Sequence, residues 1–562
     1  MDMKQTIATL MYEHLSEQWN LEEIVARITP PKHEELGDLA LPCFELAKTY
    51  RQSPQTIAQN LVAKLASVPL IEHSKAVSGY VNIFLNKKLV AEQILKEVLI
   101  EQQDYGNLEM GHKQVVTIDF SSPNIAKPFS MGHLRSTVIG NSLAFIMEKC
   151  GFKVVRINHL GDWGTQFGKL MVAYRLWGDE QKVKEHPIQE LLKLYVRFHE
   201  EAEKNESLND EARLWFKKLE DGDVEAIELW KWFREESLKE FSKIYELMSI
   251  HFDSTNGEAF YNDKMARIVK LLEERHLLEA SDGAQVVQVG DDVPPCLIKK
   301  KDGTTLYATR DLAAALYRQE TYHFAKSLYV VGNEQTLHFK QVIRVIEKMG
   351  YEWHEGMTHV PFGMMLQNGK KMSTRKGKVV LLEDVLNDAI ALAEQNIAEK
   401  NPTLHHPELV ARQVGVGAVL FHDLKNFRMN DIEFSLEDML KVEGETGPYV
   451  QYTHARASTL LKKGNYNEEQ LNRIHVDEEA WATIKFVGEF PEAIKRAYEG
   501  NDPSQIAKHL LGLCRAFNKY YGSVRILDDE NPKQSRLHVV KSVQLVLCEG
   551  LRLLGIAAPK EM

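Results

Sequence analysis

The stretch SSPNIAKPFSMGHLRSTVIGNS at residues 121–142 decides the fold of the segment around it. It follows an apolar run from Val115 to Phe120 that suits a buried strand, and it leads into a helical pattern from about Leu134 to Cys150. A second β-branched run, Lys153 to Ile157, comes next. This order of strand, loop, helix and strand predicts a parallel βαβ unit.

The loop of this unit has the features of a phosphate site. Gly132 and His133 stand where the helix is expected to begin, and a helix N-terminus offers free backbone N–H groups and a partial positive charge. Gly132 lets a nucleotide approach the backbone closely, and Lys127 adds a cation nearby. A simple helix start explains Gly132 and His133 equally well, so this motif alone leaves nucleotide binding open.

A second segment, GKKMSTRKGK at residues 369–378, is rich in lysine and arginine. A solvated basic loop accounts for most runs of this kind. Taken together, however, the two segments resemble the HIGH and KMSKS signatures of class I aminoacyl-tRNA synthetases. The HIGH tetrapeptide is Ser130 to His133, with serine in place of the first histidine. The KMSKS loop is Lys371 to Arg375, with Thr374 in place of the second lysine.

Longer strings resemble the arginyl-tRNA synthetases over essentially the full length of the chain. The family's string SPN-x-AKPFH-x-GHLRST is similar to Ser122 to Thr137, in which Ser130 is the main departure. Four other strings are similar to that family: LGDWGTQFG at 160–168, YATRDLA at 307–313, FGMM at 362–365 and GPYVQYTHARA at 447–457. These strings are long and family-specific, so they identify the family more narrowly than the two signatures do.

The resemblance and the residue patterns together predict an α/β fold class with three parts. Residues 1–112 form an N-terminal α+β domain that binds the corner of the tRNA. Residues 113–382 form a Rossmann-like catalytic domain with a parallel sheet, interrupted by a helical insertion near 175–250. Residues 383–562 follow helical patterns to the end, and they hold an all-α bundle, the anticodon-binding domain, from about residue 420. A chain of 562 residues exceeds what one hydrophobic core supports, which agrees with several domains.

Composition narrows the class of protein. The five cysteines are scattered and form no CxxC pair, so disulfides and a structural metal are not expected. No apolar stretch approaches about 18 residues, and the N-terminus lacks the apolar core of a signal peptide. We therefore expect a cytoplasmic protein without membrane contact. We also expect a monomer. The net charge of −11 does not exclude RNA, because RNA binding needs only a local basic face.

The resemblance implies an arginine–tRNA ligase that uses ATP and Mg²⁺ and binds tRNA(Arg). L-Arginine would become arginyl-adenylate and then pass to the 2′-hydroxyl of the terminal adenosine. Because adenylation is a displacement at phosphorus, it needs positioning, cations and N–H donors but no protein nucleophile. The residues implied in catalysis are Lys127, Ser130, Gly132, His133, Lys371 and Ser373, and those in ATP binding are Ser130, Gly132, His133, Met364, Lys371 and Met372.

The two departures from the signatures bear on the reaction rate. Thr374 cannot supply the positive charge of the missing lysine. Lys127 matches the family position that replaces it, and Arg375 or Lys376 is the alternative. Ser130 keeps a hydroxyl donor with a shorter reach than imidazole, so we expect a modest rise in KM or fall in kcat. The family also implies that activation requires bound tRNA.

The arginine site must hold a guanidinium, a planar and always charged group with several N–H donors, which calls for carboxylates. The resemblance assigns Glu258 and Asp311 to the guanidinium, with Tyr307 packed on it. Tyr307 and Asp311 are four residues apart, so on a helix they share one side. Asn124 and Gln335 match positions that hold the amino and carboxylate end of the substrate. Taken alone, Asp311 is more typical of a helix cap than of a ligand site.

Two regions are implied in tRNA binding. Tyr80 and Asn82 match the base-contacting pair of the N-terminal domain, and on a strand they share a face. A Tyr80 buried in the core fits the same pattern. Five C-terminal aromatic residues fit either base stacking or a helical core: Tyr449, Tyr452, Phe517, Tyr520 and Tyr521.

Two alternative functions remain open. One is a related adenylate-forming enzyme for another amino acid, which Glu258 and Asp311 argue against. The other is a non-catalytic, tRNA-binding paralogue. Ser130 and Thr374 favour that paralogue, whereas the intact His133 argues against it.

Overall fold

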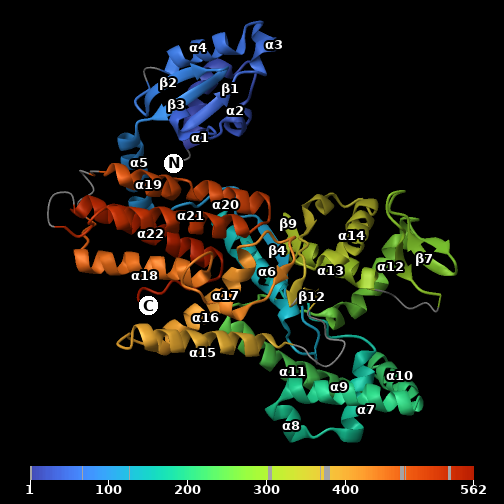
Figure 1. The fold of residues 1–562 in the computed structure, drawn as a ribbon. Helices are drawn as coiled ribbons and strands as arrows, with labels where there is room; N and C mark the ends of the chain where they lie inside the picture. The colour runs from blue at the N-terminus through green and yellow to red at the C-terminus, as the bar shows by residue number, and fades with distance from the viewer. Residues whose placement is uncertain are drawn as a thin grey trace.

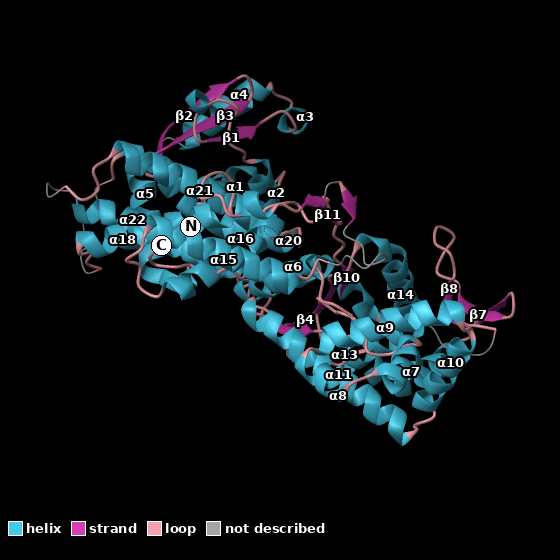
Figure 2. Cartoon of the chain, turned by 60° about the horizontal axis from the view of Figure 1, so that its bottom comes forward, coloured by secondary structure: helices cyan, strands magenta, loops and turns pink. Residues whose placement is uncertain are grey.

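The computed structural model describes residues 3–65, 68–125, 127–301, 307–367, 369–371, 380–468, 474, 476–528 and 533–562. Within them the chain forms an N-terminal α+β domain, a Rossmann-like parallel-sheet domain with a helical insertion, and a C-terminal helical bundle (Figure 1). The N-terminal domain lies on the bundle, and the insertion projects away from both (Figures 1 and 2). The fold class predicted from the sequence is confirmed.

The N-terminal domain contains a small antiparallel sheet with strands in the order β1 (Leu39–Pro42), β3 (Tyr80–Leu85) and β2 (Ile71–Val77). Its helices are α1 (Met3–Leu15), α2 (Leu21–Arg27), α3 (Leu46–Tyr50) and α4 (Pro54–Leu65). Helix α4 contacts β2 and β3 and buries an apolar stripe at i,i+4 spacing, formed by Ile57, Leu61 and Leu65. This stripe packs α4 against the sheet and forms part of the domain core.

The Rossmann-like domain is built on a parallel sheet in the order β10 (Met357–His359), β9 (Lys326–Tyr329), β4 (Val115–Asp119) and β5 (Lys153–Ile157). Strand β4, helix α6 (Met131–Lys149) and strand β5 form the βαβ unit that the sequence predicts, although the helix begins slightly before the expected position. A Cβ at Gly140 would lie 2.2 Å from the Phe120 side chain. Glycine at this position therefore lets α6 lie directly on the chain that leaves β4.

The region near residues 175–250, where a helical insertion is predicted, consists of helices. They are α7 (Gln166–Trp177), α8 (Glu180–Glu185), α9 (Pro187–Lys204), α10 (Ser207–Glu220) and α11 (Val224–Leu247). After α12 (Met265–Glu274) comes a small antiparallel sheet in the order β6 (Glu279–Ser281), β7 (Ala284–Val287) and β8 (Cys296–Lys299). The sequence pattern does not predict this sheet, because strands so short show no clear period. Helices α13 (Tyr307–Tyr322) and α14 (Thr336–Lys348) flank the return to the parallel sheet.

A third small sheet joins two distant segments of the chain. Strand β11 (Met365–Gln367) pairs antiparallel with β12 (Lys370–Lys371) and parallel with β13 (Ile432–Glu433). The expectation that residues 383–562 are helical throughout is wrong at β13. So short a strand exists only because it pairs with β11, which lies far away in the sequence, and no local period reveals it.

The C-terminal part is helical apart from β13 within its described residues. Its helices are α15 (Leu382–Lys400), α16 (Pro407–Leu424), α17 (Leu436–Met439), α18 (Gly447–Gly464), α19 (Trp481–Gly488), α20 (Phe490–Glu499), α21 (Ser504–Ser523) and α22 (Lys533–Leu553). Helix α5 (Lys87–Glu101), which follows the N-terminal sheet, packs on α19 and α22. A Cβ at Gly488 would lie 2.6 Å from the Ile94 side chain, so glycine permits this close packing.

Candidate functional site

The start of helix α6 is held against the segment that precedes α15. Ser130 is the N-cap residue of α6 in an extended conformation. The Met131 N–H donates to the Val380 carbonyl at 3.1 Å, and the Leu382 N–H donates to the Phe129 carbonyl at 2.9 Å. These two bonds fix the HIGH-like tetrapeptide beside the residues that follow the KMSKS-like loop.

The imidazole of His133 is turned back toward the N-cap. The Ser130 N–H donates to His133 Nδ1 at 3.1 Å, so a neutral ring carries its proton on Nε2. Burial, and to a smaller extent the nearby Lys127 ammonium, lower the pKa of His133 to about 4. At neutral pH this side chain is an uncharged donor, and its Nε2–H remains for an outside acceptor.

Ser130 and Gly132 leave room above this helix end. The Ser130 hydroxyl lies 3.2 Å from His133 Nδ1, so serine remains within the local hydrogen-bond network where the family has histidine. Gly132 is exposed, and a Cβ there would meet only Ser130 Oγ at 3.4 Å, an ordinary contact. Among the described residues, no other neighbour restricts this position, which suits close approach by a ligand.

Lys127 is exposed and stands at the edge of a pocket. Its backbone N–H donates to the Asn124 carbonyl at 3.3 Å, and Asn124 in turn packs on Gly161, where a Cβ would lie 2.2 Å from the Asn124 Oδ1. The pocket is open to solvent and is lined by Ile125, Lys127, Gln166, Phe167, Leu170 and Tyr195. The Lys127 ammonium is therefore available to a ligand between the loop and the insertion helices.

The turn after β4 holds two serines in left-handed backbone conformations. Ser121 has φ 73° and Ser122 has φ 46°. The Ser121 N–H donates to Ser136 Oγ at 2.9 Å, and the Ser122 N–H donates to Asn158 Oδ1 at 3.2 Å. The Ser122 hydroxyl donates to Asp119 at 3.0 Å. Backbone strain kept in place by several hydrogen bonds is typical of positions that orient a functional loop.

Glu258 is a largely buried carboxyl group beside the loop that follows β5. Its backbone N–H donates to the Leu160 carbonyl at 2.9 Å. The Arg310 Nη1 lies 3.7 Å from Glu258 Oε2, and the glutamate side chain is only 18% exposed. Burial raises the pKa of Glu258 to about 7, although the Arg310 charge acts in the opposite direction.

Asp162, which the sequence-based prediction omits, anchors the Glu258 segment. Its Oδ1 accepts the Ala259 N–H at 2.8 Å, and its Oδ2 accepts Arg234 Nε at 2.8 Å. A Cβ at Gly257 would lie 2.5 Å from this carboxylate, so the loop passes directly over it. Arg234 belongs to α11, and the pair therefore connects the insertion to the Glu258 loop. The string LGDWG marks Asp162 in the sequence, whereas no local pattern marks Arg234.

Asp311 lies near the start of α13 and its carboxylate contacts α14. Its Oδ2 is 2.5 Å from His338 Nε2. Burial acts to raise the pKa of Asp311, but the hydrogen bond from His338 and the charges of His338, His159 and Arg318 outweigh it and hold the pKa below its ordinary value. Tyr307, one turn earlier on the same helix, is 65% exposed. His338 has no sequence signal that distinguishes it from other histidines.

The predicted substrate residues gather at the carboxyl ends of the parallel strands. Asn124 follows β4, Glu258 bonds to the chain after β5, Gln335 follows β9 and Met364 follows β10. Gln335 is exposed at the N-cap position of α14, and Met364 is 36% exposed. In open parallel sheets this edge is where ligands bind.

The KMSKS-like loop lies only partly within the described residues. The backbone of Lys371 forms the end of strand β12, whereas Met372, Ser373, Thr374, Arg375 and Lys376 lie outside the described residues. The Met364 N–H, just before β11, donates to Asp431 Oδ1 at 2.7 Å. This bond and the β11–β13 pairing place the hairpin that carries Lys371.

The two residues predicted for the N-terminal domain differ in exposure. Tyr80 is 39% exposed and packs edge-on against Phe44, with ring centroids 5.1 Å apart, so it is not a core residue. Asn82 is 4% exposed and lies in the central strand between Ala40 and Lys75. Of the two residues, only Tyr80 has a side chain that is substantially exposed to solvent.

The C-terminal aromatic residues divide into core and surface. Phe517 and Tyr520 are buried, and Tyr449 is half-buried. Tyr452 is 39% exposed and Tyr521 is 41% exposed. The guanidinium carbon of Arg456 lies 4.8 Å from the Tyr452 ring centroid and 5.1 Å from that of Tyr521. The three side chains form an exposed stack, which we call the α18–α21 stack.

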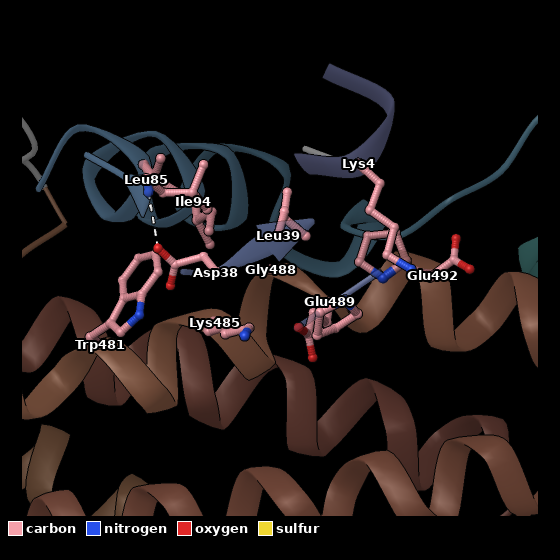
Figure 3. Close-up of a pocket in the computed structure, with 13 residues that line it drawn as sticks. Lys4, Asp38, Leu39, Leu85, Ile94, Trp481, Lys485, Gly488, Glu489 and Glu492 are labelled. Carbon is pink, nitrogen blue, oxygen red and sulfur yellow. Dashed lines mark hydrogen bonds between the residues drawn. The ribbon is translucent and has the colours of Figure 1, made fainter. Parts of the chain in front are cut away.

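A pocket open to solvent lies away from these residues, between the N-terminal domain and the bundle. Figure 3 shows Leu39 and Leu85 on one side of it with Trp481 and Lys485 on the other. None of its lining residues belongs to the predicted site. Among the helices within the described ranges, none is both long and apolar enough to cross a membrane.

Each of the three parts of the chain matches a known protein family. Residues 3–85 match the family "Arginyl tRNA synthetase N terminal domain", residues 94–436 match "tRNA synthetases class I (R), catalytic domain", and residues 450–562 match "DALR anticodon binding domain". Arginine–tRNA ligases of Exiguobacterium sibiricum and Enterococcus faecalis are 59% and 56% identical to this chain, each over 100% of both chains.

Solved structures agree with the sequence comparison. The arginyl-tRNA synthetase of Thermus thermophilus superposes with a TM-score of 0.84 at 25% identity, over 100% of both chains. That of Plasmodium falciparum gives a TM-score of 0.82 at 24% identity and covers 100% of this chain and 99% of its own. From the end-to-end match in sequence and in its three component domains, the chain belongs to the arginyl-tRNA synthetase family of class I aminoacyl-tRNA synthetases.

Proposed function

We propose that this chain ligates L-arginine to tRNA(Arg) with ATP and Mg²⁺. Arginyl-adenylate forms first, and the arginyl group then passes to the 2′-hydroxyl of the terminal adenosine. The observation that carries the proposal is the gathering of a helix N-terminus, a neutral histidine donor and two carboxyl groups at one edge of the parallel sheet. The first two suit a triphosphate, and the carboxyl groups suit a guanidinium.

In the adenylation step, the arginine carboxylate attacks the α-phosphorus of ATP and pyrophosphate leaves. The His133 Nε2–H and the free N–H groups of α6 donate to phosphate oxygens, and Lys127 and Lys371 neutralise the negative charge that spreads in the transition state. Ser373, Met372 and Met364 complete the nucleotide site. Mg²⁺ is carried by the ATP phosphates and supplies further positive charge.

Glu258 and Asp311 select arginine, with Tyr307 packed on the guanidinium. A guanidinium near Glu258 favours its ionised form and brings its raised pKa down. An amino acid without this cation would leave buried carboxyl groups unpaired, which disfavours its binding. Asn124 and Gln335 hold the amino and carboxylate end.

The tRNA contacts two surfaces that carry exposed aromatic residues. Tyr80 and its neighbour Phe44 offer rings to an unpaired base at the outer corner of the tRNA, and Asn82 reads its edge after a local opening of the surface. The α18–α21 stack of Tyr452, Arg456 and Tyr521 offers both aromatic and cationic faces to anticodon bases. Activation requires this bound tRNA.

The test is transfer of labelled arginine to total tRNA, with ATP and Mg²⁺, for the parent chain and for Lys127→Ala. Charging by the parent that is lost in the variant supports the ligase and Lys127 as the replacement cation. Charging that the variant retains keeps the ligase and moves that role to Arg375 or Lys376. Tight tRNA binding by the parent without any charging would establish the non-catalytic paralogue instead.

A further inference from the structure

Arg135, in the HIGH-bearing helix α6, is a fully buried side chain with three partners outside its helix. Its Nε lies 3.1 Å from Asp423 Oδ2 of α16, and both side chains are 1% exposed. Its Nη1 donates to the Asn430 carbonyl at 2.7 Å, and its Nη2 donates to the Arg428 carbonyl at 3.1 Å. One guanidinium thus fixes the segment between α16 and β13 to the catalytic helix.

Arg428, in that fixed segment, bridges two parts of the molecule. Its Nη1 donates to the Pro361 carbonyl at 2.7 Å, just before the β11–β12 hairpin. Its Nε donates to the Asn501 carbonyl at 3.1 Å, in the corner between α20 and α21 of the bundle. The planar guanidinium holds its donors in fixed directions, so both carbonyl groups are held at a set separation.

The corner that Arg428 contacts is itself rigid. Asn501 has φ 45°, and the Asp502 N–H donates to the Ala497 carbonyl at 2.9 Å. The Asp502 carboxylate accepts the N–H of Ser504 at 3.1 Å and the Ser504 hydroxyl at 3.0 Å. Displacement of α20 or α21 would therefore move the Asn501 carbonyl rather than be absorbed by the turn.

The other end of the bridge is equally tight. The Gly363 N–H donates to the Arg428 carbonyl at 2.9 Å, and a Cβ at Gly363 would lie 2.7 Å from the carbonyl oxygens of Met429 and Asn430. Directly after this point, Met364 bonds to Asp431, and β11 pairs with β13. The segment that leads into the hairpin has little freedom to move independently of Arg428.

We propose that Arg428 is a positioning residue that couples the anticodon-binding bundle to the hairpin carrying Lys371. The inference rests on the proposed function, because it assigns a path by which tRNA bound on the bundle affects adenylation. Arg428 touches neither ATP nor arginine in this scheme. It sets where the β11–β12 hairpin sits relative to α6, and the α20–α21 corner sets where Arg428 sits.

This coupling is a free energy between two sites, so it is measured by combining changes at both. One change is Arg428→Gln, which removes the two-way bridge and keeps a polar side chain. The other is a substitution of the middle anticodon base in a transcript of an arginine-accepting tRNA. Each enzyme is assayed with each transcript for kcat and for KM of the tRNA.

If Arg428 couples the sites, the anticodon substitution lowers kcat by about tenfold in the parent chain, within the usual range of coupling energies. In Arg428→Gln, kcat with the unmodified transcript is lower than in the parent chain. The anticodon substitution lowers the kcat of this variant further by less than about threefold. The rise in KM for tRNA is the same in both enzymes, since the stacking surface is intact. A residue with a merely structural role would leave the anticodon penalty on kcat unchanged.

Lys326→Met is the matched control. The Lys326 ammonium lies 5.2 Å from the Tyr498 ring centroid, so it contacts the same end of α20 without reaching the hairpin. Its anticodon penalty should equal that of the parent. If Arg428→Gln does not fold, Asn501→Gly takes its place. Glycine tolerates the positive φ at this position and gives the α20–α21 corner more freedom to move. This variant, too, should reduce the fall in kcat that the anticodon substitution causes.

Equal anticodon penalties on kcat in the parent and in the Arg428 and Asn501 variants would overturn the coupling role. A parent penalty that appears only in KM would overturn it as well. Failure of the parent to charge arginine at all would instead refute the proposed function, and the two failures are distinguished in the first assay of the series.

Discussion

The proposed catalytic edge of the sheet and the proposed RNA-binding surfaces use different means to place their side chains. At the edge, His133, Glu258 and Asp311 are partly or largely buried, and each is held by a hydrogen bond or ion pair to a named partner. On the bundle surface, Tyr452 and Tyr521 are about 40% exposed and are held by stacking on Arg456. Substitutions at the edge should therefore affect chemistry strongly, and those on the surface should affect affinity moderately.

Burial explains this difference in physical terms. A polar group in a low-dielectric site interacts strongly with developing charge, whereas an exposed side chain competes with water. In the proposed function, the sheet edge stabilises a transition state, while the bundle surface retains tRNA through many small contacts. The changes below test the contrast from the largest expected effect to the smallest.

The largest effect is expected at His133. Removing one preorganised donor to a developing oxyanion typically costs about 10²–10³ in kcat, and we expect His133→Ala to fall in this range. Arginine-dependent ATP–pyrophosphate exchange in the presence of tRNA measures the loss. His133→Gln, whose amide N–H can approach the position of Nε2, should retain more activity. A variant that binds tRNA normally and exchanges pyrophosphate at the parent rate would remove His133 from the mechanism.

Asp311 should affect arginine more than ATP. Hydrogen bonds between charged groups contribute about 1.5–3 kcal/mol, so Asp311→Asn should raise KM for arginine by about 10- to 100-fold. KM for ATP should change by less than about twofold, since the nucleotide end is built from other residues. Steady-state charging with each substrate varied separately gives both constants. Equal rises in both KM values would indicate a general distortion of the site.

Glu258 should make arginine binding depend on pH. Burial raises its pKa to about 7, so the carboxyl group is neutral below that pH and ionised above it. Only the ionised form attracts a guanidinium, so KM for arginine should fall as pH rises from about 6 to 8, by about tenfold. Glu258→Gln should have a high KM at every pH in this range. Parallel pH profiles for the parent and the variant would show that another group titrates.

Arg234 should act on the same site through the Asp162 carboxylate. Arg234→Gln removes a charge-assisted hydrogen bond to the residue that anchors the Glu258 loop, and KM for arginine should rise by about five- to tenfold. Arg175→Gln is the control, because Arg175 pairs with Glu225 on the exposed surface of the same insertion. The control should leave KM for arginine unchanged, and an equal effect of both would point to the insertion as a whole.

The sequence predicted the local parts of this molecule better than the distant ones. The βαβ unit and the helix-start position of Gly132 and His133 follow from apolar periodicity and a contiguous string. Strand β13 and the ion pair of Arg135 with Asp423 do not, because each depends on a partner far away in the chain. The sheet β6–β8 was missed for a related reason, since its strands are too short to show a period.

Site residues divide in the same way. The resemblance names Glu258 and Asp311, but each finds its partner far away in the chain: Glu258 pairs with Arg310, and Asp311 with His338. The pKa of a carboxyl group in the folded protein depends on such partners and on burial. The amino-acid composition specifies neither of them. Surface and core aromatic residues of the bundle show the same helical spacing in the sequence. Only their exposure in the structure distinguishes them.

The smallest effect is expected at the α18–α21 stack. Loss of one stacked base costs at least about 1 kcal/mol, so Tyr452→Ala and Tyr521→Ala should each raise KM for tRNA by about fivefold, with kcat little changed. Phe517→Ala is the contrasting variant, because Phe517 is 0% exposed and its loss leaves a cavity that should cost about 3–5 kcal/mol of stability. Charging kinetics and thermal unfolding of all three variants separate the two classes. If Tyr452→Ala lowered the melting temperature as much as Phe517→Ala did and left KM for tRNA unchanged, the exposed ring would be part of the bundle's support and not of its RNA surface.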